Sequence, residues 1–187
     1  MSLKVLAGIV KGRKLKTPSY NTLSIRPILG RIKKSIFDII QAKLKNSIFI
    51  DLFAGVGTVG IEALSRGAKR VTFVDINDVS LSIIRHNIDV LGFNNVRIVK
   101  CNIMKNLQMF LYEKYDIIFM GPPYNSKKYD IEMCHVLRDI VRYNILKDDS
   151  ILIVQKHIKE HVGDVYGLEC FRIKKYGDTI ISFYKKN

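Results

Sequence analysis

Two short segments of this sequence carry residue types and spacings that could do chemistry. The first is a glycine-rich run, Asp51-Leu52-Phe53-Ala54-Gly55-Val56-Gly57-Thr58-Val59-Gly60, and the second, about seventy positions later, is Gly121-Pro122-Pro123-Tyr124. A glycine-rich turn can hold a nucleotide-like cofactor, because its backbone can approach a ligand closely. A Pro-Pro-Tyr loop can clamp a flat ring that bears an amino group. Together the two segments predict methyl transfer from S-adenosylmethionine to a base nitrogen.

The glycine-rich run fits the pattern G-x-G-x-x-G between a predicted strand and a predicted helix. Asp75 ends the next predicted strand, twenty positions after Gly55 (75 − 55 = 20), where a carboxylate can accept hydrogen bonds from ribose hydroxyls. These features alone also fit a nicotinamide dinucleotide. Asp51 favours S-adenosylmethionine, because its carboxylate would attract an ammonium group and repel a pyrophosphate. A chain of 187 residues also leaves little room for the substrate domain of a dehydrogenase, and a tight connection that binds nothing is a further alternative.

Asn102-Ile103 follows the third predicted strand and is a second candidate cofactor contact. At the carboxyl edge of an open sheet these residues would lie near an adenine ring, whose polar edge the Asn102 amide could bond. Asn is also a favoured helix N-cap, and both roles can hold together.

The elements that must position these residues alternate between strand and helix from residue 47 onward. Nearly continuous apolar runs, typical of strands buried on both faces, alternate with helical patterns, which predicts a parallel sheet with helices on both sides. A strand pair around Tyr176-Gly177-Asp178 predicts a closing hairpin. The expected strands are 47–53, 71–75, 96–100, 115–120, 150–155, 168–175 and 179–185, and the expected helices are 58–65, 77–91, 103–113 and 131–143.

The part of the chain before this alternation is basic. Residues 30–45 predict an amphipathic helix with Arg31, Lys33 and Lys34 near its start, where positive charges oppose the helix dipole. An anionic partner could relieve that cost, or the three could form a solvated basic turn. Upstream, short strands are expected around a turn at Gly12, and Ile25-Arg26-Pro27 is expected to be extended.

The composition indicates one globular domain with a polyanionic partner. Hydrophobic residues make up 48% of the chain, the net charge is +14 and the pI is about 9.7. Nucleic acid is the expected partner, although a Lys- and Ile-rich coding bias could also produce this charge.

The cysteines and histidines predict no metal site and no disulfide framework. Cys101, Cys134 and Cys170 form no CxxC pair, and the i, i+4 pair His157 and His161 lies in a polar segment, where a solvated pair is expected. No signal peptide and no apolar run of about 18 residues is visible, so we expect a cytoplasmic protein that does not span a membrane.

These residues resemble the RsmD-type family of 16S ribosomal RNA guanine-N2 methyltransferases over nearly the whole chain. The Pro-Pro-Tyr segment alone is shared by several amino methyltransferases, and the N-terminal Gly-Arg-Lys and Arg-Pro segments make the resemblance specific. The segments that carry it are 8–15, 25–37, 51–68 and 176–179.

The resemblance implies a Rossmann-like class I methyltransferase fold with a mostly parallel seven-stranded sheet and a C-terminal antiparallel hairpin. It implies S-adenosylmethionine as donor, a guanine of 16S rRNA within a small-subunit particle as acceptor, and a monomer. Residues 1–29 would be a basic, RNA-contacting extension and residues 30–187 the cofactor-binding domain. The implied cofactor contacts are Asp51, Gly55 and Gly57 for the methionyl end, Asp75 for the ribose, and Asn102 and Ile103 for the adenine, and Phe53 and Ile76 are further expected cofactor contacts. The implied RNA contacts are Lys11, Arg13, Lys14, Arg26 and Arg31.

The loop departs from the family at one position, because Gly121 stands where the family carries Asp. A guanine exocyclic amine is a poor nucleophile, so acceptors that bond its hydrogens must direct its lone pair at the methyl group. The Pro122 carbonyl can accept one such bond and Tyr124 can stack on the base, but Gly121 removes the carboxylate. The candidate catalytic residues are therefore Gly121, Pro122, Pro123 and Tyr124.

Three interpretations of Gly121 are open. Another acceptor or water could substitute at a reduced rate, with Asn125 and Asp130 as candidates by sequence proximity. Alternatively, the protein could bind cofactor and RNA without efficient turnover, or a single nucleotide change could have replaced Asp.

Two other enzyme classes are alternatives for the whole chain. A DNA adenine-N6 methyltransferase would use the same kind of loop to hold its target amine, but the target-recognition region that such an enzyme usually needs is not visible in the sequence. A small NAD-dependent enzyme is the remaining alternative.

Overall fold

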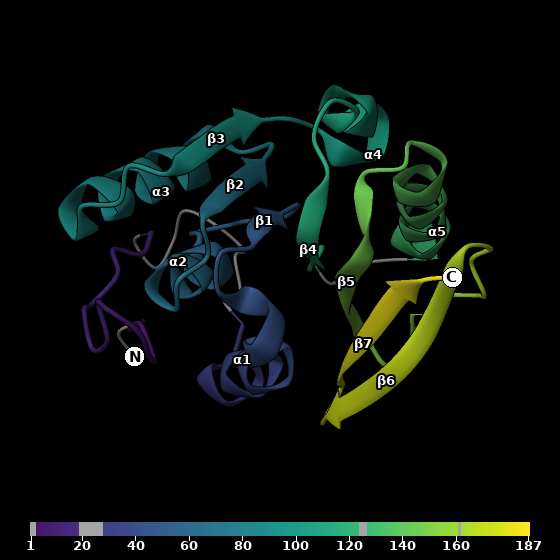
Figure 1. The fold of residues 1–187 in the computed structure, drawn as a ribbon, viewed down its shortest axis with the longest axis horizontal. Helices are drawn as coiled ribbons and strands as arrows, with labels where there is room; N and C mark the ends of the chain where they lie inside the picture. The colour runs from purple at the N-terminus through teal and green to yellow at the C-terminus, as the bar shows by residue number, and fades with distance from the viewer. Residues whose placement is uncertain (1–2, 19–27, 124–126, 161) are drawn as a thin grey trace.

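The structure is a computed structural model that describes residues 3–18, 28–123, 127–160 and 162–187, with the backbone alone for 127–132. The strands of the described residues form one seven-stranded sheet in the order β3-β2-β1-β4-β5-β7-β6 (Figure 1). Strands β1 to β5 run parallel, β7 is antiparallel to β5, and β6 is antiparallel to β7. The predicted mostly parallel Rossmann-like sheet with a C-terminal hairpin is therefore confirmed. The strands are β1 (Ile48–Asp51), β2 (Arg70–Asp75), β3 (Val96–Lys100), β4 (Tyr115–Met120), β5 (Leu146–His157), β6 (Leu168–Tyr176) and β7 (Thr179–Lys186).

Helices cover both faces of the sheet. Successive residues of a strand point to opposite sides, so strands that are apolar throughout leave two apolar faces for helices to bury. In β5, Ile151 and Ile153 pack in one core and Leu152 and Val154 in the other. The first core contains residues of three helices, α1 (Gly30–Leu44), α2 (Thr58–Ser65) and α3 (Asp78–Leu91). The second contains residues of α4 (Ile103–Asn106), the 3₁₀ helix η1 (Leu107–Phe110) and α5 (Lys127–Arg142). No helix in the described ranges combines the length and apolar character that a membrane span requires.

Several element boundaries differ from the prediction for local physical reasons. The predicted helix 103–113 is wrong beyond Asn106, because Leu107 and Phe110 are both buried and a three-residue period suits a 3₁₀ turn. Strand β5 begins at Leu146 rather than 150, since its pairing with β4 jumps from Tyr115↔Leu146 to Ile117↔Ile151 across a charged bulge. Strand β1 is shorter than predicted and α5 begins four residues earlier.

The N-terminal segment pairs briefly with itself and packs on the first core. A single antiparallel bridge joins Lys4 and Lys14, and the side chains of Val5 and Leu15 are buried with those of α1 and α2. The Val5 N–H donates to the Arg13 carbonyl at 3.1 Å and the Leu15 N–H donates to the Leu3 carbonyl at 2.9 Å, whereas Ile9, in the turn, donates to the Ser65 carbonyl at 2.8 Å. The predicted antiparallel pairing around the turn at Gly12 is therefore present, but as one bridge with no strand on either side.

Buried Glu62 on α2 fixes this segment in place. Its carboxylate accepts the N–H groups of Leu6 at 2.8 Å and Ala7 at 2.9 Å, and it pairs with Arg66 at 2.8 Å and Lys33 at 3.1 Å. Lys33 is therefore buried against a carboxylate of its own chain. For this residue, the two predicted environments, a solvated basic turn and an anionic binding partner, are both wrong. Burial lowers the pKa of the Lys33 ammonium, and Glu62 opposes that shift.

Candidate cofactor and target-base site

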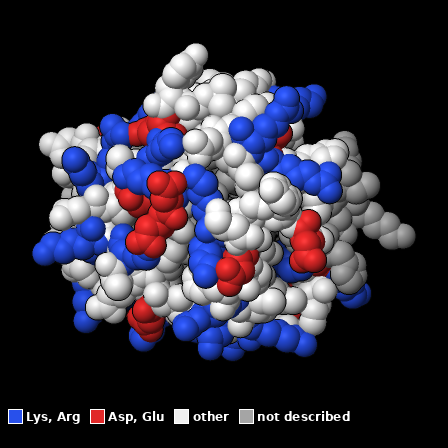
Figure 2. All heavy atoms as spheres, turned by 45° about the vertical axis from the view of Figure 1, so that its right-hand side comes forward, with Lys and Arg blue, Asp and Glu red and all other residues white. Residues whose placement is uncertain are grey.

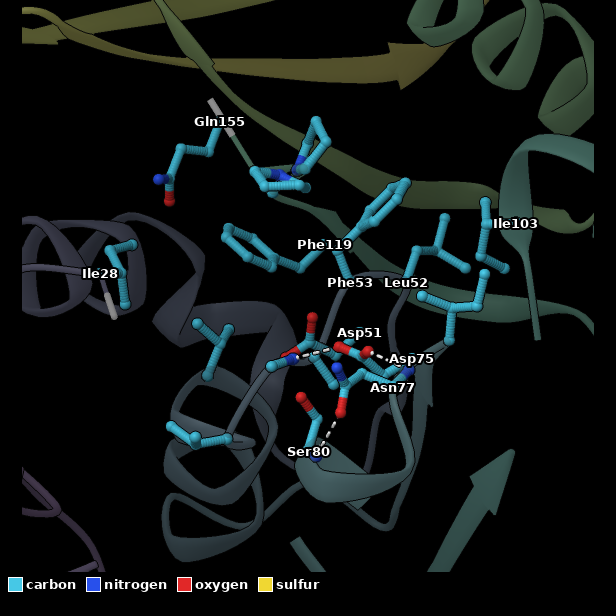
Figure 3. Close-up of a pocket in the computed structure, with 18 of the residues that line it drawn as sticks. Ile28, Asp51, Leu52, Phe53, Asp75, Asn77, Ser80, Ile103, Phe119 and Gln155 are labelled. Carbon is cyan, nitrogen blue, oxygen red and sulfur yellow. Dashed lines mark hydrogen bonds between the residues drawn. The ribbon is translucent and has the colours of Figure 1, made fainter. Parts of the chain in front are cut away.

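A cavity of about 660 Å³ lies at the edge of the sheet where the parallel strands β1 to β5 end. This is the expected place for a ligand in an open α/β sheet, and the volume is typical of small-molecule sites. It brings together the glycine-rich turn and the Gly-Pro-Pro segment, which are far apart in the sequence (Figure 3). The predicted site residues that line it are Asp51, Phe53, Gly55, Asp75, Ile76, Asn102, Ile103, Gly121, Pro122 and Pro123.

Other predicted residues lie elsewhere. Gly57 is in the turn but is not among the cavity-lining residues, and Lys11, Arg13, Lys14 and Arg31 are exposed and do not line the cavity. Arg26, Tyr124, Asn125 and His161 lie outside the described residues, as does the side chain of Asp130. His157 ends strand β5 and lines the cavity, rather than lying on a helix. Within the described ranges, no group of three or more His, Cys, Asp or Glu side chains could hold a metal ion.

The glycine-rich turn has the geometry that its sequence predicts. Strand β1 ends at Asp51, and Gly57 caps α2 in the left-handed region at φ 80°, where a side chain would be strained. Inside α2, a β-carbon on Gly60 would lie 2.3 Å from the Phe73 ring, so glycine lets the helix pack closely on β2. The turn is thus held close to the sheet, with Gly55 facing the cavity.

Asp75 at the end of β2 fixes the shape of the turn. Its Oδ2 accepts the Gly55 N–H at 2.7 Å and its Oδ1 accepts the Asn77 N–H at 2.8 Å. Burial raises the pKa of the Asp75 carboxyl, and these backbone N–H groups oppose the shift. Each carboxylate oxygen keeps a further lone pair that could accept from a ligand hydroxyl.

Asp51 is the most perturbed acid of the site. Its side chain is 1% exposed, and Oδ1 has no hydrogen-bond partner among the residues that the structure describes. Burial raises the pKa of its carboxyl from 3.8 to about 7, and the charge of Asp75 adds to this, whereas the N–H groups of Gly60 and Phe53 oppose it. A buried carboxylate oxygen without a partner is costly, and a cationic ligand group would relieve that cost.

The ends of β2 and β3 form a rim suited to a flat ring. Ile76 is 59% exposed and presents apolar surface to the cavity, whereas Ile103, which also lines it, is 3% exposed. Asn102 caps α4, accepting the Met104 N–H at 3.1 Å through Oδ1. The predicted cap is confirmed, and the adenine contact stays a prediction.

At the end of β4, Gly121 lies beside two side chains that the sequence did not single out. A β-carbon on Gly121 would lie 3.0 Å from Cε1 of Phe119 and 3.6 Å from Oε1 of Gln155, and both residues line the cavity. Gln155 ends the apolar run predicted as a strand, so the rule that ligands bind at carboxyl ends of strands could have found it. Pro122 is buried and Pro123 is exposed.

Known proteins share both the sequence and the fold of this chain. The family model described as conserved hypothetical protein 95 matches residues 3–185. Ribosomal RNA small subunit methyltransferase D of Buchnera aphidicola subsp. Acyrthosiphon pisum is 36% identical over 122 residues, which span 65% of this chain and 63% of that protein. "Putative rRNA methyltransferase YlbH" of Bacillus subtilis is 30% identical over 191 residues, 98% of this chain and 99% of the relative.

The solved structure titled "Putative methyltransferase yhhF from Escherichia coli" superposes with a TM-score of 0.82 at 22% identity, covering 100% of this chain and 99% of that one. This likeness extends the shared fold over the whole chain, including the N-terminal segment and the closing hairpin. With the match of the family model, it shows that the chain belongs to the conserved hypothetical protein 95 family, the RsmD-type methyltransferase family that its sequence resembles.

Proposed function

We propose that this protein transfers a methyl group from S-adenosylmethionine to the exocyclic N2 amine of a guanine in 16S ribosomal RNA. One observation carries the proposal: a single cavity is lined both by Asp51, whose Oδ1 has no hydrogen-bond partner within the described ranges, and by the Gly121-Pro122-Pro123 segment. A cation-seeking group and a base-clamping loop are the two halves of a methyl-transfer site. The names of the Buchnera and Bacillus relatives support ribosomal RNA as the acceptor.

The residues present fit the donor. Asp51 would pair with its ammonium group, Asp75 would accept from the ribose hydroxyls, and Ile76 and Ile103 would enclose the adenine. The turn at Gly55 leaves room for the methionyl chain, since no side chain projects there. When bound, the donor supplies an electrophilic methyl carbon on a sulfonium, which leaves as a neutral thioether.

The loop after β4 would act on the acceptor. The carbonyl of Pro122 could accept one N–H of the guanine amine, which directs the nitrogen lone pair at the methyl carbon. Pro122 is buried, and its ring restricts the backbone at this position. The proton that the nitrogen loses after transfer would pass to water.

The charge of the chain supports an RNA substrate. Lys11, Arg13 and Lys14 are exposed on the N-terminal turn, within the 1–29 segment that we propose as an RNA contact. On the face shown in Figure 2, Lys and Arg side chains are widely spread, with smaller groups of Asp and Glu between them. A net charge of +14 therefore favours binding to phosphates over a broad surface.

The test combines two measurements on the full chain. Calorimetric titration with adenosylhomocysteine measures cofactor binding. Transfer of labelled methyl groups is then measured on small ribosomal subunits from a strain that lacks its own enzyme of this family, on protein-free 16S rRNA and on duplex DNA. We expect label in RNA, recovered as N2-methylguanosine after digestion. Label in DNA instead, or in another nucleoside, would contradict the proposal.

Gly121 favours a second candidate, an RNA-binding relative with impaired turnover. This alternative predicts that the wild type binds adenosylhomocysteine and small subunits but transfers no label, while Gly121→Asp restores transfer. Turnover by the wild type would exclude it.

A further inference from the structure

Gln155 lies next to Gly121 across the junction of two paired strands. The register of β4 and β5 pairs Phe119 with Ile153 and Met120 with Val154, so the next residues along the two strands are Gly121 and Gln155. Phe119 and Ile153 both pack in the first core, and alternation along each strand directs positions 121 and 155 to that same side. Gln155 also lines the cavity, across from Asp51 and Asp75 (Figure 3).

The side-chain oxygen of Gln155 lies where a group on residue 121 would extend. Of the three heavy atoms nearest to the position of a β-carbon on Gly121, two belong to the Phe119 ring and the third is Oε1 of Gln155, at 3.6 Å. An acidic side chain at position 121 would place its oxygens close to this point. The cavity therefore has an acceptor oxygen beside Gly121, supplied by the neighbouring strand.

We propose that Oε1 of Gln155 accepts an N–H of the target amine and takes the place of the carboxylate that Gly121 lacks. The inference rests on the proposed function. The amine would then be held by two carbonyl oxygens, Pro122 O and Gln155 Oε1. Its lone pair forms the new N–C bond, the C–S bond of the donor breaks, and that electron pair stays on sulfur. An amide oxygen is a weak base, so the proton leaves to water rather than to Gln155.

A neutral acceptor also suits the charges of this cavity. Asp51 and Asp75 already place two carboxyl groups along its lining, and a third at position 121 would add like-charge repulsion.

The experiment compares Gln155→Leu, which removes the acceptor at similar size, with Gln155→Glu, which keeps an acceptor oxygen. Gln41→Leu is the matched control, because Gln41 is exposed on α1 and does not line the cavity. Steady-state methyl transfer is measured on unmethylated small subunits, and the Kd for adenosylhomocysteine is measured by calorimetry. We expect Gln155→Leu to lower kcat by about 100-fold with a Kd within about twofold of wild type. Gln155→Glu should lower kcat by about tenfold or less, and the kcat of Gln41→Leu should equal that of wild type.

A double-mutant cycle separates acceptor loss from structural damage. If the two positions supply alternative acceptors, Gly121→Asp should raise kcat about tenfold more in the Gln155→Leu background than in wild type. Gly121→Ala adds the β-carbon without the carboxylate, so it should raise kcat neither in the Gln155→Leu background nor in wild type. A merely structural role of Gln155 would give no rescue by Gly121→Asp.

The outcomes distinguish this inference from the proposed function. If the wild type methylates RNA and Gln155→Leu is equally active, or is impaired without rescue by Gly121→Asp, the role of Gln155 is wrong and the proposed function stands. If the wild type binds adenosylhomocysteine but methylates no RNA, the proposed function and this role both fail. A reduced kcat with specific rescue supports both.

Discussion

The ring of Phe119 occupies the space that a side chain on residue 121 would need. A β-carbon added to Gly121 would lie 3.0 Å from Cε1 and 3.2 Å from Cζ of Phe119, which is tighter than ordinary van der Waals contact. The two residues lie two positions apart, so their side chains point to the same side of the strand. Phe119 is 3% exposed, and its ring must shift before any larger residue fits at position 121.

We therefore expect Gly121→Ala to lower the free energy of unfolding by about 1 kcal/mol, since an overpacked core must rearrange. In a Phe119→Leu background the same change should cost less, because the ring edge is gone. Urea denaturation of the cofactor-free protein measures both. Gly163→Ala is the matched control, as a β-carbon there meets no atom within 4 Å. Equal costs at the two glycines would contradict the contact with Phe119.

Asp51 should make cofactor binding depend on pH. Its pKa is raised to about 7, so below that pH the cofactor-free protein carries a neutral Asp51, and binding of an ammonium group must release the proton. Between pH 7 and 5 the Kd for adenosylhomocysteine should rise by about tenfold per pH unit, and it should level off near pH 8. Calorimetry in buffers of different ionisation enthalpy measures both the Kd and the released proton. In Asp51→Asn the Kd should depend less on pH, and binding at pH 8 should be weaker than in wild type. If the Kd of this variant still rises as pH falls, the titrating group is another one, and Asp75 is the nearest candidate.

The same acid should reduce the stability of the cofactor-free protein. The pKa of Asp51 is higher in the folded state than its ordinary value of 3.8, so the folded state binds the proton more tightly. Wild-type stability therefore falls as pH rises from about 4 to 7, and the full cost is present above pH 7. Asp51→Asn should be more stable than wild type at pH 8 by about 4 kcal/mol, and the difference should vanish below about pH 4. Urea denaturation at several pH values gives the difference, which would stay constant with pH if Asp51 did not titrate in this range.

Much of the fold could be predicted because its signals are local. Strand β4 and helix α2 were predicted with the bounds 115–120 and 58–65 that the structure shows, since one is a short apolar run and the other follows a glycine turn. The start of β5 was missed, because Lys147 and the two aspartates after it interrupt the apolar run. That strand is continued by pairing of Leu146 with Tyr115 on β4, which is a contact between distant parts of the chain.

Prediction of the site from the sequence was limited in the same way. Residues at the ends of the first strands could be found because their types follow motifs, as with Asp51 and Asp75. Gln155 and Phe119 carry no motif, and their importance comes from lying beside Gly121 in the folded sheet. The partner of Lys33 was also hidden, because Glu62 is twenty-nine positions away (62 − 33 = 29) and its burial depends on the N-terminal segment packing over it.

The Glu62 network predicts a strong dependence of stability on one carboxylate. Glu62→Gln removes the charge that pairs with buried Lys33 and places an NH₂ group against backbone N–H donors, so the unfolding free energy should fall by about 3–5 kcal/mol. Asp38→Asn is the matched control, since it removes the exposed pair with Lys34 and should cost less than about 1 kcal/mol. Urea denaturation measures both, and hydrogen exchange at Leu6 and Ala7 should accelerate in Glu62→Gln alone. Equal losses in the two variants would show that the buried network adds no stability.

The N-terminal turn should contribute to RNA binding through its charges. If Lys11, Arg13 and Lys14 contact phosphates, changing all three to Gln should reduce the slope of log Kd against log salt concentration by about 2–3. The measurement is fluorescence titration of 16S rRNA at several salt concentrations. The matched control changes Arg172, Lys174 and Lys175 to Gln, three exposed cations on β6, which is an edge strand of the sheet (Figure 1). Both variants lower the net charge by three, so an equal loss of slope would mean that the whole charge of the protein, rather than this turn, binds the RNA.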